Sequence, residues 1–222
     1  MDRNRIGLLG IWGWGGLALN DAAMDTRVKA VATSVMYDMS RAMGHGVGDG
    51  KDRYTTADRR AVLRYLNEQR WKDAENGAYA PGGHDIYVDE KGNASAGDRI
   101  LPETLPANPN TVLKEFFDYY RMPRGFHARS VNSTGAWNAT MPLSFMNMPL
   151  LSYANEVTIP TLIVTGEKAH SRYFAEDAFK AIGSKEKELI IVPGANHVDL
   201  YDNAAGKIPF AKFEQFFKTS LR

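Results

Sequence analysis

The sequence has 222 residues, a length that suits one domain with a buried core rather than two domains of ordinary size. Apolar residues make up 44% and charged residues 24%, which excludes the disordered and fibrous classes. Lysine and arginine number 27 against 26 acidic residues, so a formal net charge of +1 offers no electrostatic basis for binding nucleic acid or an anionic membrane. Cysteine is absent, which excludes disulfides, thiolate metal sites and a cysteine nucleophile.

The first predicted element is a strand over residues 5–11, with Arg5 at its start and Ile11 at its end. Its apolar residues do not alternate with polar ones, a pattern typical of a strand buried on both faces of a parallel sheet. A cluster of glycines at positions 13, 15 and 16 then predicts a tight turn. We therefore expect this strand at the centre of the sheet.

Residues 17–24 have helix-forming composition, and residues 28–36 are again β-branched and apolar. Strand, glycine turn, helix and strand in this order are typical of a βαβ unit. The pattern predicts an α/β protein with a parallel sheet.

From about residue 40 to residue 155 the pattern changes to helices and long polar loops. Apolar residues at three- and four-residue spacing predict helices over residues 56–76 and 110–120. The segment between them, residues 77–110, is rich in Gly, Pro and Asn and is predicted to be an exposed excursion. An insertion of this kind between sheet strands usually forms a lid or a pocket wall.

Sheet character returns in residues 160–166 and 187–192, with a helix predicted over residues 175–182 between them. A closing amphipathic helix is predicted over residues 208–221. We expect its four phenylalanines to belong to the core: Phe210, Phe213, Phe216 and Phe217.

The first strand and the glycines resemble a nucleophile elbow, in which a strand ends in small-x-nucleophile-x-small. Placing the last small residue at Gly16 puts the nucleophile at Trp14 and the other small position at Trp12. An indole has no nucleophilic atom for acyl transfer, and its N–H only donates. Gly15, directly after the nucleophile position, is expected to offer one backbone N–H to an oxyanion.

The partners of a catalytic triad are expected at the ends of later strands. His197 follows the last strand, where the general base of this fold stands. The acid that orients the base is Glu167 or, alternatively, Asp38, each placed just after a strand. Glu176 and Asp177 are further alternatives, and acidic residues at strand ends are also commonly solvated or capping.

Five blocks of the sequence together resemble bacterial α/β hydrolases related to dienelactone hydrolase and the acetyl-xylan-esterase-like proteins. In chain order they start at Ile6, Asp25, Met36, Gly166 and Asn196: Ile6-Gly-Leu-Leu-Gly-Ile-Trp-Gly-Trp-Gly-Gly16, Asp25-Thr-Arg-Val-Lys-Ala-Val-Ala32, Met36-Tyr-Asp-Met-Ser-Arg41, Gly166-Glu-Lys-Ala-His-Ser-Arg-Tyr-Phe174 and Asn196-His-Val-Asp-Leu-Tyr-Asp202.

The resemblance implies an α/β-hydrolase fold, hydrolysis of small esters or lactones, and no cofactor or metal. The family elbow places a cysteine at the position of Trp12 and a serine at that of Trp14, so the resemblance also implies impaired or lost serine-hydrolase activity. About four further strands precede the elbow in such folds, and we expect the chain to be a truncated form.

Two other classes of function remain open. Gly13-x-Gly15-x-x-Ala18 after a strand, with Asp38 at the end of the next, also fits a dinucleotide-binding βαβ unit, although Asp38 lies beyond the usual spacing. The second alternative is a non-catalytic binding or assembly protein on a hydrolase scaffold, because indoles at both elbow positions fill the space of a substrate acyl group.

The remaining histidines, His45, His84, His127 and His170, lack metal-ligand spacing and are expected at the surface or in loops. Trp71, Trp137 and the methionine-rich segment 141–148 are expected to pack the insertion. Since Ser171 is adjacent to His170 along the chain, the two are not expected to form a catalytic pair.

The predicted partners follow from the first strand. If no strand precedes it, the side of residues 5–11 away from the second strand is free, and Leu8, Leu9 and Ile11 expose apolar surface. We therefore expect a homodimer through this edge. No apolar run approaches the roughly 20 residues of a spanning helix, and the start of the chain lacks a signal-peptide pattern, so a cytoplasmic location is expected.

Overall fold

The computed structural model describes residues 2–48, 50–83 and 85–222. The chain divides into two compact units, each with its own core. The first unit comprises Met1–Met39, Gly48–Lys51 and Pro149–Arg222, and the second comprises Ser40–Val47 and Asp52–Met148. The second unit falls within the insertion predicted for residues 40–155.

The first unit is built on a four-stranded parallel sheet with strand order β1-β2-β7-β8. The strands agree with the predicted ones in type, and their ends agree to within two residues: β1 is Ile6–Ile11, β2 is Val28–Ser34, β7 is Thr161–Gly166 and β8 is Lys187–Val192. Two short 3-10 helices, η1 (Ala154–Glu156) and η2 (Val198–Leu200), belong to the same unit.

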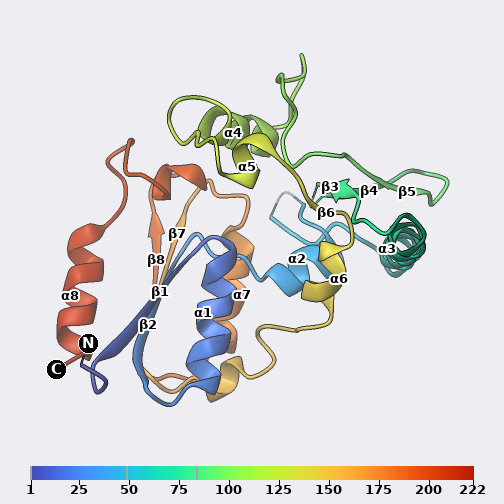
Figure 1. The fold of residues 1–222 in the computed structure, drawn as a ribbon. Helices are drawn as coiled ribbons and strands as arrows, with labels where there is room; N and C mark the ends of the chain where they lie inside the picture. Colours follow the sequence, from blue (N-terminus) through green and yellow to red (C-terminus); the bar gives the residue numbers. More distant parts are fainter. Residues whose placement is uncertain (1, 49, 84) are drawn as a thin grey trace. The chain divides into compact units, whose positions relative to one another are not determined.

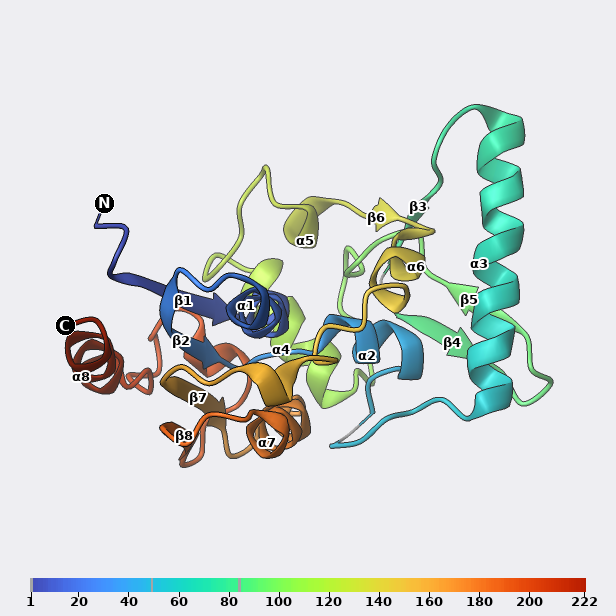
Figure 2. The ribbon, with the colours of Figure 1, turned by 90° about the horizontal axis from the view of Figure 1, so that it is seen from below.

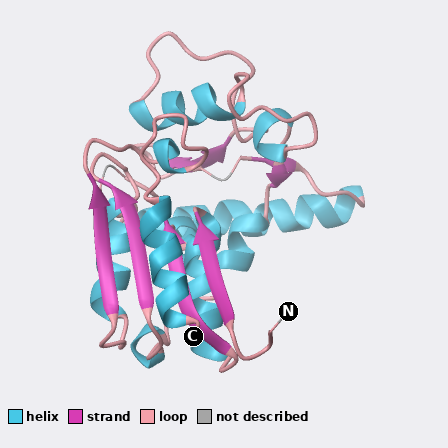
Figure 3. Cartoon of the chain, turned by 90° about the vertical axis from the view of Figure 1, so that its left-hand side faces the viewer, coloured by secondary structure: helices cyan, strands magenta, loops and turns pink. Residues whose placement is uncertain are grey.

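Helices cover both faces of this sheet (Figures 1 and 3). On one face, α1 (Gly13–Met24) and α7 (Arg172–Ala181) bury a cluster that includes Leu19 and Ile163. On the other face, α8 (Phe210–Ser220) packs Phe213 against strand residues such as Val164. The core of the first unit is therefore the two apolar layers on either side of β2 and β7.

The helix α1 begins at Gly13, four residues earlier than predicted, so Gly15 and Gly16 lie inside the helix rather than in a turn. A side chain at Gly15 would overlap Met36, and one at Gly16 would overlap the carbonyl of Tyr37. These glycines are required because the first turns of α1 press against the segment that follows β2.

The strand β1 ends the sheet among the residues that the structure describes, and it is not buried on both faces as its apolar run predicted. Leu9 is 50% exposed and Ile11 is 40% exposed. Leu9 and Ile11 lie on the same face of the strand, and that face is left largely uncovered; along its edge, β1 pairs within the described chain with β2.

The prediction that all four phenylalanines of α8 are core residues is wrong for Phe210, which is 59% exposed. Phe213 is buried, and Phe216 and Phe217 pack partly buried against the same cluster. Phe210 begins the helix, and only the three that follow it face the sheet at three- and four-residue spacing.

The longest helix of the second unit, α3, spans Thr56–Asn76, as predicted. A capping box of Thr55 and Asp58 begins it, and Gly77 in the left-handed conformation (φ 65°) ends it. The helix α4, Thr111–Tyr120, is also confirmed, with the side chain of Asn110 accepting a hydrogen bond from the backbone N–H of Leu113 at 2.8 Å.

Residues 77–110 are not a wholly exposed excursion. The strands β4 (Ile86–Val88) and β5 (Ala94–Ala96) form an antiparallel pair beside α3, as Figure 2 shows, and Ile86 is buried with Val62 and Leu66. The short strand β3 (Pro81–Gly82) pairs with β6 (Trp137–Asn138). Apolar residues spaced for a hairpin override the Gly-rich composition.

Three short helices complete the second unit: α2 (Met39–His45), α5 (Val131–Thr134) and α6 (Met141–Met146). Trp71, on α3, does not pack this unit as predicted, because it is 73% exposed. In the described parts of the chain, no helix is long and apolar enough to cross a membrane.

Candidate functional site

The carboxyl ends of the four parallel strands bring together most of the reactive side chains of the first unit. Trp12 follows β1, Tyr37 follows β2, His170 and Ser171 follow β7, and His197 follows β8. In a parallel sheet all these ends lie along one edge, which is where α/β folds bind their ligands. This edge is the candidate site.

The strained turn of the elbow falls on Trp12 and not on Trp14. Trp12 has φ 55° and ψ −127°, a conformation that non-glycine residues rarely adopt, and α1 starts at the next residue. Its carbonyl accepts hydrogen bonds from the N–H groups of Gly15 and Tyr37, both at 2.9 Å. Trp14 is a helical residue and is 69% exposed. Of the two tryptophans, Trp12 alone has the strained strand-to-helix backbone that is typical of a nucleophile position.

Gly15 was predicted as an oxyanion donor, and the structure contradicts this. Its N–H already donates to the carbonyl of Trp12 within the first turn of α1. With the elbow at Trp12, the residue directly after it is Gly13, whose N–H is one of the first donors of the helix.

The loop that carries His197 is held by its neighbours. The side chain of Asp199 accepts a hydrogen bond from the N–H of Asn196 at 3.1 Å, and the side chain of Asn196 accepts one from the N–H of Asp199 at 2.9 Å. Lys207 adds an ion pair to Asp199 at 2.8 Å. This reciprocal capping fixes the start of η2 and thereby the direction of the histidine side chain.

Both ring nitrogens of His197 meet hydroxyl groups. Nδ1 lies 2.7 Å from the Oγ of Ser171, and Nε2 lies 2.7 Å from the hydroxyl of Tyr201. His197 and Ser171 are fully buried. Ser171 is the N-cap residue of α7, yet its hydroxyl bonds to His197 instead of capping the helix. The histidine is therefore enclosed between two hydroxyls.

Burial lowers the pKa of His197 well below 6.5, and the charge of nearby His170 lowers it further. The two imidazole rings lie close, with centroids 4.8 Å apart. His197 is consequently neutral at pH 7, with one nitrogen donating and the other accepting. A neutral imidazole is the right protonation state for a general base, but this one has no exposed surface.

Tyr37 fills the space beside the elbow. Its hydroxyl bonds to the Nε2 of His170, and its ring meets His197 edge to face with centroids 5.3 Å apart. The same ring contacts Trp12 with centroids 6.0 Å apart and Phe174 with centroids 5.1 Å apart. Aromatic side chains thus occupy the region next to residue 12 where a substrate would react.

The expectation that Glu167 orients His197 is wrong. Glu167 is exposed, and its Oε2 accepts a hydrogen bond from the backbone N–H of Gly194 at 2.7 Å. The hydroxyl of Ser171 meets Nδ1 of His197, where an acid was expected. Asp38, the alternative acid, is buried directly before α2.

The two remaining acids, Glu176 and Asp177, pair with Arg172 and Lys180 on the surface of α7. Their side chains therefore serve intrahelical ion pairs of the (i, i+4) and (i, i+3) kind.

Four members of the site were not predicted: Tyr37, His170, Ser171 and Tyr201. His170 lies in the loop between β7 and α7, in keeping with the expected surface or loop position, but it is buried at 6% exposure, whereas His45 and His127 are exposed. His84 lies outside the described residues. Their positions in the sequence could have indicated the four unpredicted members. Tyr37, His170 and Ser171 all follow strands of one parallel sheet, and Tyr201 lies four residues after His197.

Neither of the two sequence features that suggested dinucleotide binding is supported by the structure. Asp38 lies four residues beyond the end of β2 at Ser34, and the glycines of α1 are explained by close packing against Met36 and Tyr37. Across residues 2–48, 50–83 and 85–222, no group of three or more His, Asp or Glu side chains is arranged to hold a metal ion.

No protein-family model matches the chain. It is 48% identical over 224 residues to the uncharacterized protein PA2218 of Pseudomonas aeruginosa, covering all of this chain and 54% of PA2218. It is 25% identical over 205 residues to the uncharacterized protein YcjY of Escherichia coli, covering 92% of this chain and 60% of YcjY. The chain thus spans somewhat more than half the length of these relatives.

The crystal structure of PA2218 superposes on the whole chain with a TM-score of 0.86 at 47% identity, and the match covers 62% of the PA2218 chain. The crystal structure of the α/β hydrolase GrgF from a Penicillium species superposes with a TM-score of 0.66 at 17% identity, covering 99% of this chain and 65% of GrgF. The protein therefore has the α/β-hydrolase fold, as the sequence predicted.

Proposed function

We propose that this protein is an α/β-hydrolase-like protein whose serine-hydrolase activity is impaired or lost. The single observation that carries the proposal is that the strained elbow position holds Trp12. Acyl transfer at an elbow needs a nucleophilic oxygen or sulfur on that residue, and an indole has neither.

The arrangement of the base supports the same proposal. In a working triad one nitrogen of the histidine faces the nucleophile and the other faces the acid that orients it. Here Ser171 meets one nitrogen and Tyr201 meets the other, both at 2.7 Å. No nitrogen of His197 is left for a nucleophile at residue 12, and His197 has no surface through which a substrate could reach it.

Any activity that remains is expected to act on a small ester or lactone. This substrate class rests on the resemblance of the sequence blocks to dienelactone-hydrolase-like and acetyl-xylan-esterase-like proteins. Ser171 is the hydroxyl that such activity would have to use, because its Oγ is within hydrogen-bond distance of the Nδ1 of His197, at 2.7 Å. Its complete burial opposes this role.

A fluorophosphonate probe together with hydrolysis of p-nitrophenyl acetate tests the proposal. We expect no covalent adduct and no hydrolysis above that of heat-denatured protein, with a known serine esterase as the positive control. Stoichiometric labelling of any serine would overturn the proposal. If the label maps to Ser171 and disappears in Ser171→Ala, the activity belongs to the Ser171–His197 pair.

A non-catalytic binding or assembly role on the same scaffold is the second candidate. The observation that favours it is the packing of Tyr37, which contacts both Trp12 and His197 and fills the site with aromatic rings. A protein with this role also forms no adduct with the fluorophosphonate probe. Binding of a ligand without its hydrolysis would distinguish this role.

A further inference from the structure

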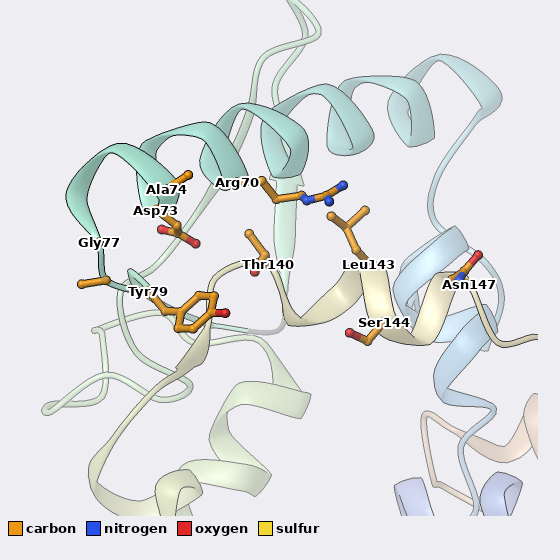
Figure 4. A pocket seen from close by; sticks show the side chains of 10 residues that line it. Arg70, Asp73, Ala74, Gly77, Tyr79, Thr140, Leu143, Ser144 and Asn147 are labelled. Carbon is orange, nitrogen blue, oxygen red and sulfur yellow. The ribbon is translucent and has the colours of Figure 1, made fainter.

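The second unit contains a cavity of about 810 Å³ between α3 and α6 (Figure 4). Its volume lies within the range of small-molecule sites. The cavity is lined by the end of α3, the turn that follows it, and α6 with its flanking residues: Arg70, Asp73, Ala74, Gly77, Ala78, Tyr79, Thr140, Leu143, Ser144 and Asn147. None of these residues belongs to the histidine site of the first unit.

Asp73 supplies the first recognition group. Its side chain is buried, with a residue exposure of 7%, and its Oδ1 accepts hydrogen bonds from the side chain of Gln69 at 2.7 Å and the N–H of Ala80 at 3.0 Å. Its Oδ2 has no hydrogen-bond partner in the described structure. A buried carboxylate oxygen without a donor is costly, so this oxygen favours a ligand that brings one.

Arg70 supplies the second group. It is exposed, and it lies three residues before Asp73 on α3. In Figure 4 its guanidinium extends toward Leu143 and away from Asp73. Its contact with the side-chain oxygen of Asn67 is long, at 3.4 Å, and involves one of its five N–H donors. The remaining donors suit an anionic group, which guanidinium binds in bidentate fashion.

We propose that this cavity binds a small zwitterion. Its anionic group, such as a carboxylate, pairs with Arg70, and its ammonium group donates to the Oδ2 of Asp73. Ammonium is favoured over hydroxyl because a charge-assisted hydrogen bond to a buried carboxylate is the stronger one. The apolar part of the ligand lies along Ala74 and Leu143, which line the cavity with the two charged groups. The site is independent of the elbow and of its chemistry.

Isothermal titration calorimetry with 6-aminohexanoate tests the charge pattern. This compound carries a carboxylate and an ammonium group at the two ends of an apolar chain, while hexanoate and hexylamine each carry one of them. We expect 6-aminohexanoate to bind at least tenfold more tightly than either of the others. Equal affinities for the three compounds, or no binding of 6-aminohexanoate at millimolar concentration, would overturn the proposal.

Variants on α3 locate the site. Arg70→Gln is expected to weaken the binding of 6-aminohexanoate at least tenfold, whereas Arg64→Gln, on the same helix but outside the cavity, leaves it unchanged. Asp73→Asn should weaken the binding of 6-aminohexanoate but not that of hexanoate. Equal effects of Arg70→Gln and Arg64→Gln would refute the assignment, and this pair decides the matter even if Asp73→Asn unfolds the protein.

Discussion

The two candidate sites of this protein differ in what surrounds their charged and polar groups. The histidine site of the first unit is closed: His197 and Ser171 are fully buried, and each ring nitrogen of His197 lies 2.7 Å from a protein hydroxyl. The cavity of the second unit is open: Arg70 is exposed, and the Oδ2 of Asp73 has no donor among the described residues. The difference is that the polar groups at the strand ends already bond to other protein groups, whereas the cavity holds polar groups that could still bind a ligand.

The largest effect expected from this contrast is on stability. His197→Leu removes the hydrogen bonds that Ser171 and Tyr201 make to the buried ring, at a cost of about 3 kcal/mol in the free energy of unfolding. Arg70→Gln, at the open cavity, should change it by less than about 0.5 kcal/mol. Urea denaturation measures both. Similar values for the two variants would break the contrast between the closed and the open site.

The second prediction concerns pH. Because the pKa of His197 is lowered in the folded state, the unfolded chain binds a proton near pH 6.5 that the folded chain does not. The contribution of the neutral His197 to the free energy of unfolding is therefore fully present above pH 6.5. Below pH 6.5 this contribution falls by up to about 1.4 kcal/mol per pH unit.

His197→Gln should remove this part of the slope between pH 6.5 and pH 5, measured by urea denaturation at each pH. His45→Gln is the matched control, since His45 is an exposed histidine outside the candidate site. An unchanged slope in His197→Gln would show that the histidine is not held neutral by the fold.

The third prediction concerns the strand β1, which exposes apolar side chains. Leu9 and Ile11 are half exposed, and within the described chain β1 pairs with β2 alone. We expect association through this edge, most simply as a two-fold dimer. Leu9→Lys should weaken it at least tenfold, about 1.4 kcal/mol, whereas Lys91→Glu in the second unit should not. Sedimentation at micromolar concentration checks this, and a soluble wild-type monomer of 24.7 kDa would refute it.

The smallest expected effect is on catalysis. Replacing both tryptophans, as Trp12→Cys with Trp14→Ser, should leave ester hydrolysis within about tenfold of the wild type, because Tyr201 and Ser171 still occupy both nitrogens of His197. A positioned general base contributes about 10²–10⁴-fold. A rise of that size in the double variant, measured with p-nitrophenyl acetate, would show that the closed site opens readily once a nucleophile is present.

The elements of the sheet could be predicted closely because they depend on local composition. Residues 189–192 of β8 form an apolar run with three β-branched residues, and the capping box of Thr55 and Asp58 with Gly77 marks both ends of α3 in the sequence itself. The start of α1 could not be predicted in this way. Glycines such as Gly15 and Gly16 suit a turn, but they also suit a helix that packs closely against residues such as Met36 and Tyr37.

For the candidate site, the sequence determined that His197 follows the last strand, that tryptophans stand at positions 12 and 14 beside the glycine cluster, and that the fold is that of an α/β hydrolase. Only the tertiary structure decided that Trp12 rather than Trp14 carries the strain, and that Ser171 and Tyr201 rather than Glu167 meet the ring of His197. The reason is physical: composition and periodicity report backbone conformation, whereas the partner of a buried side chain depends on contacts such as Ser171 to His197, 26 residues apart in the chain.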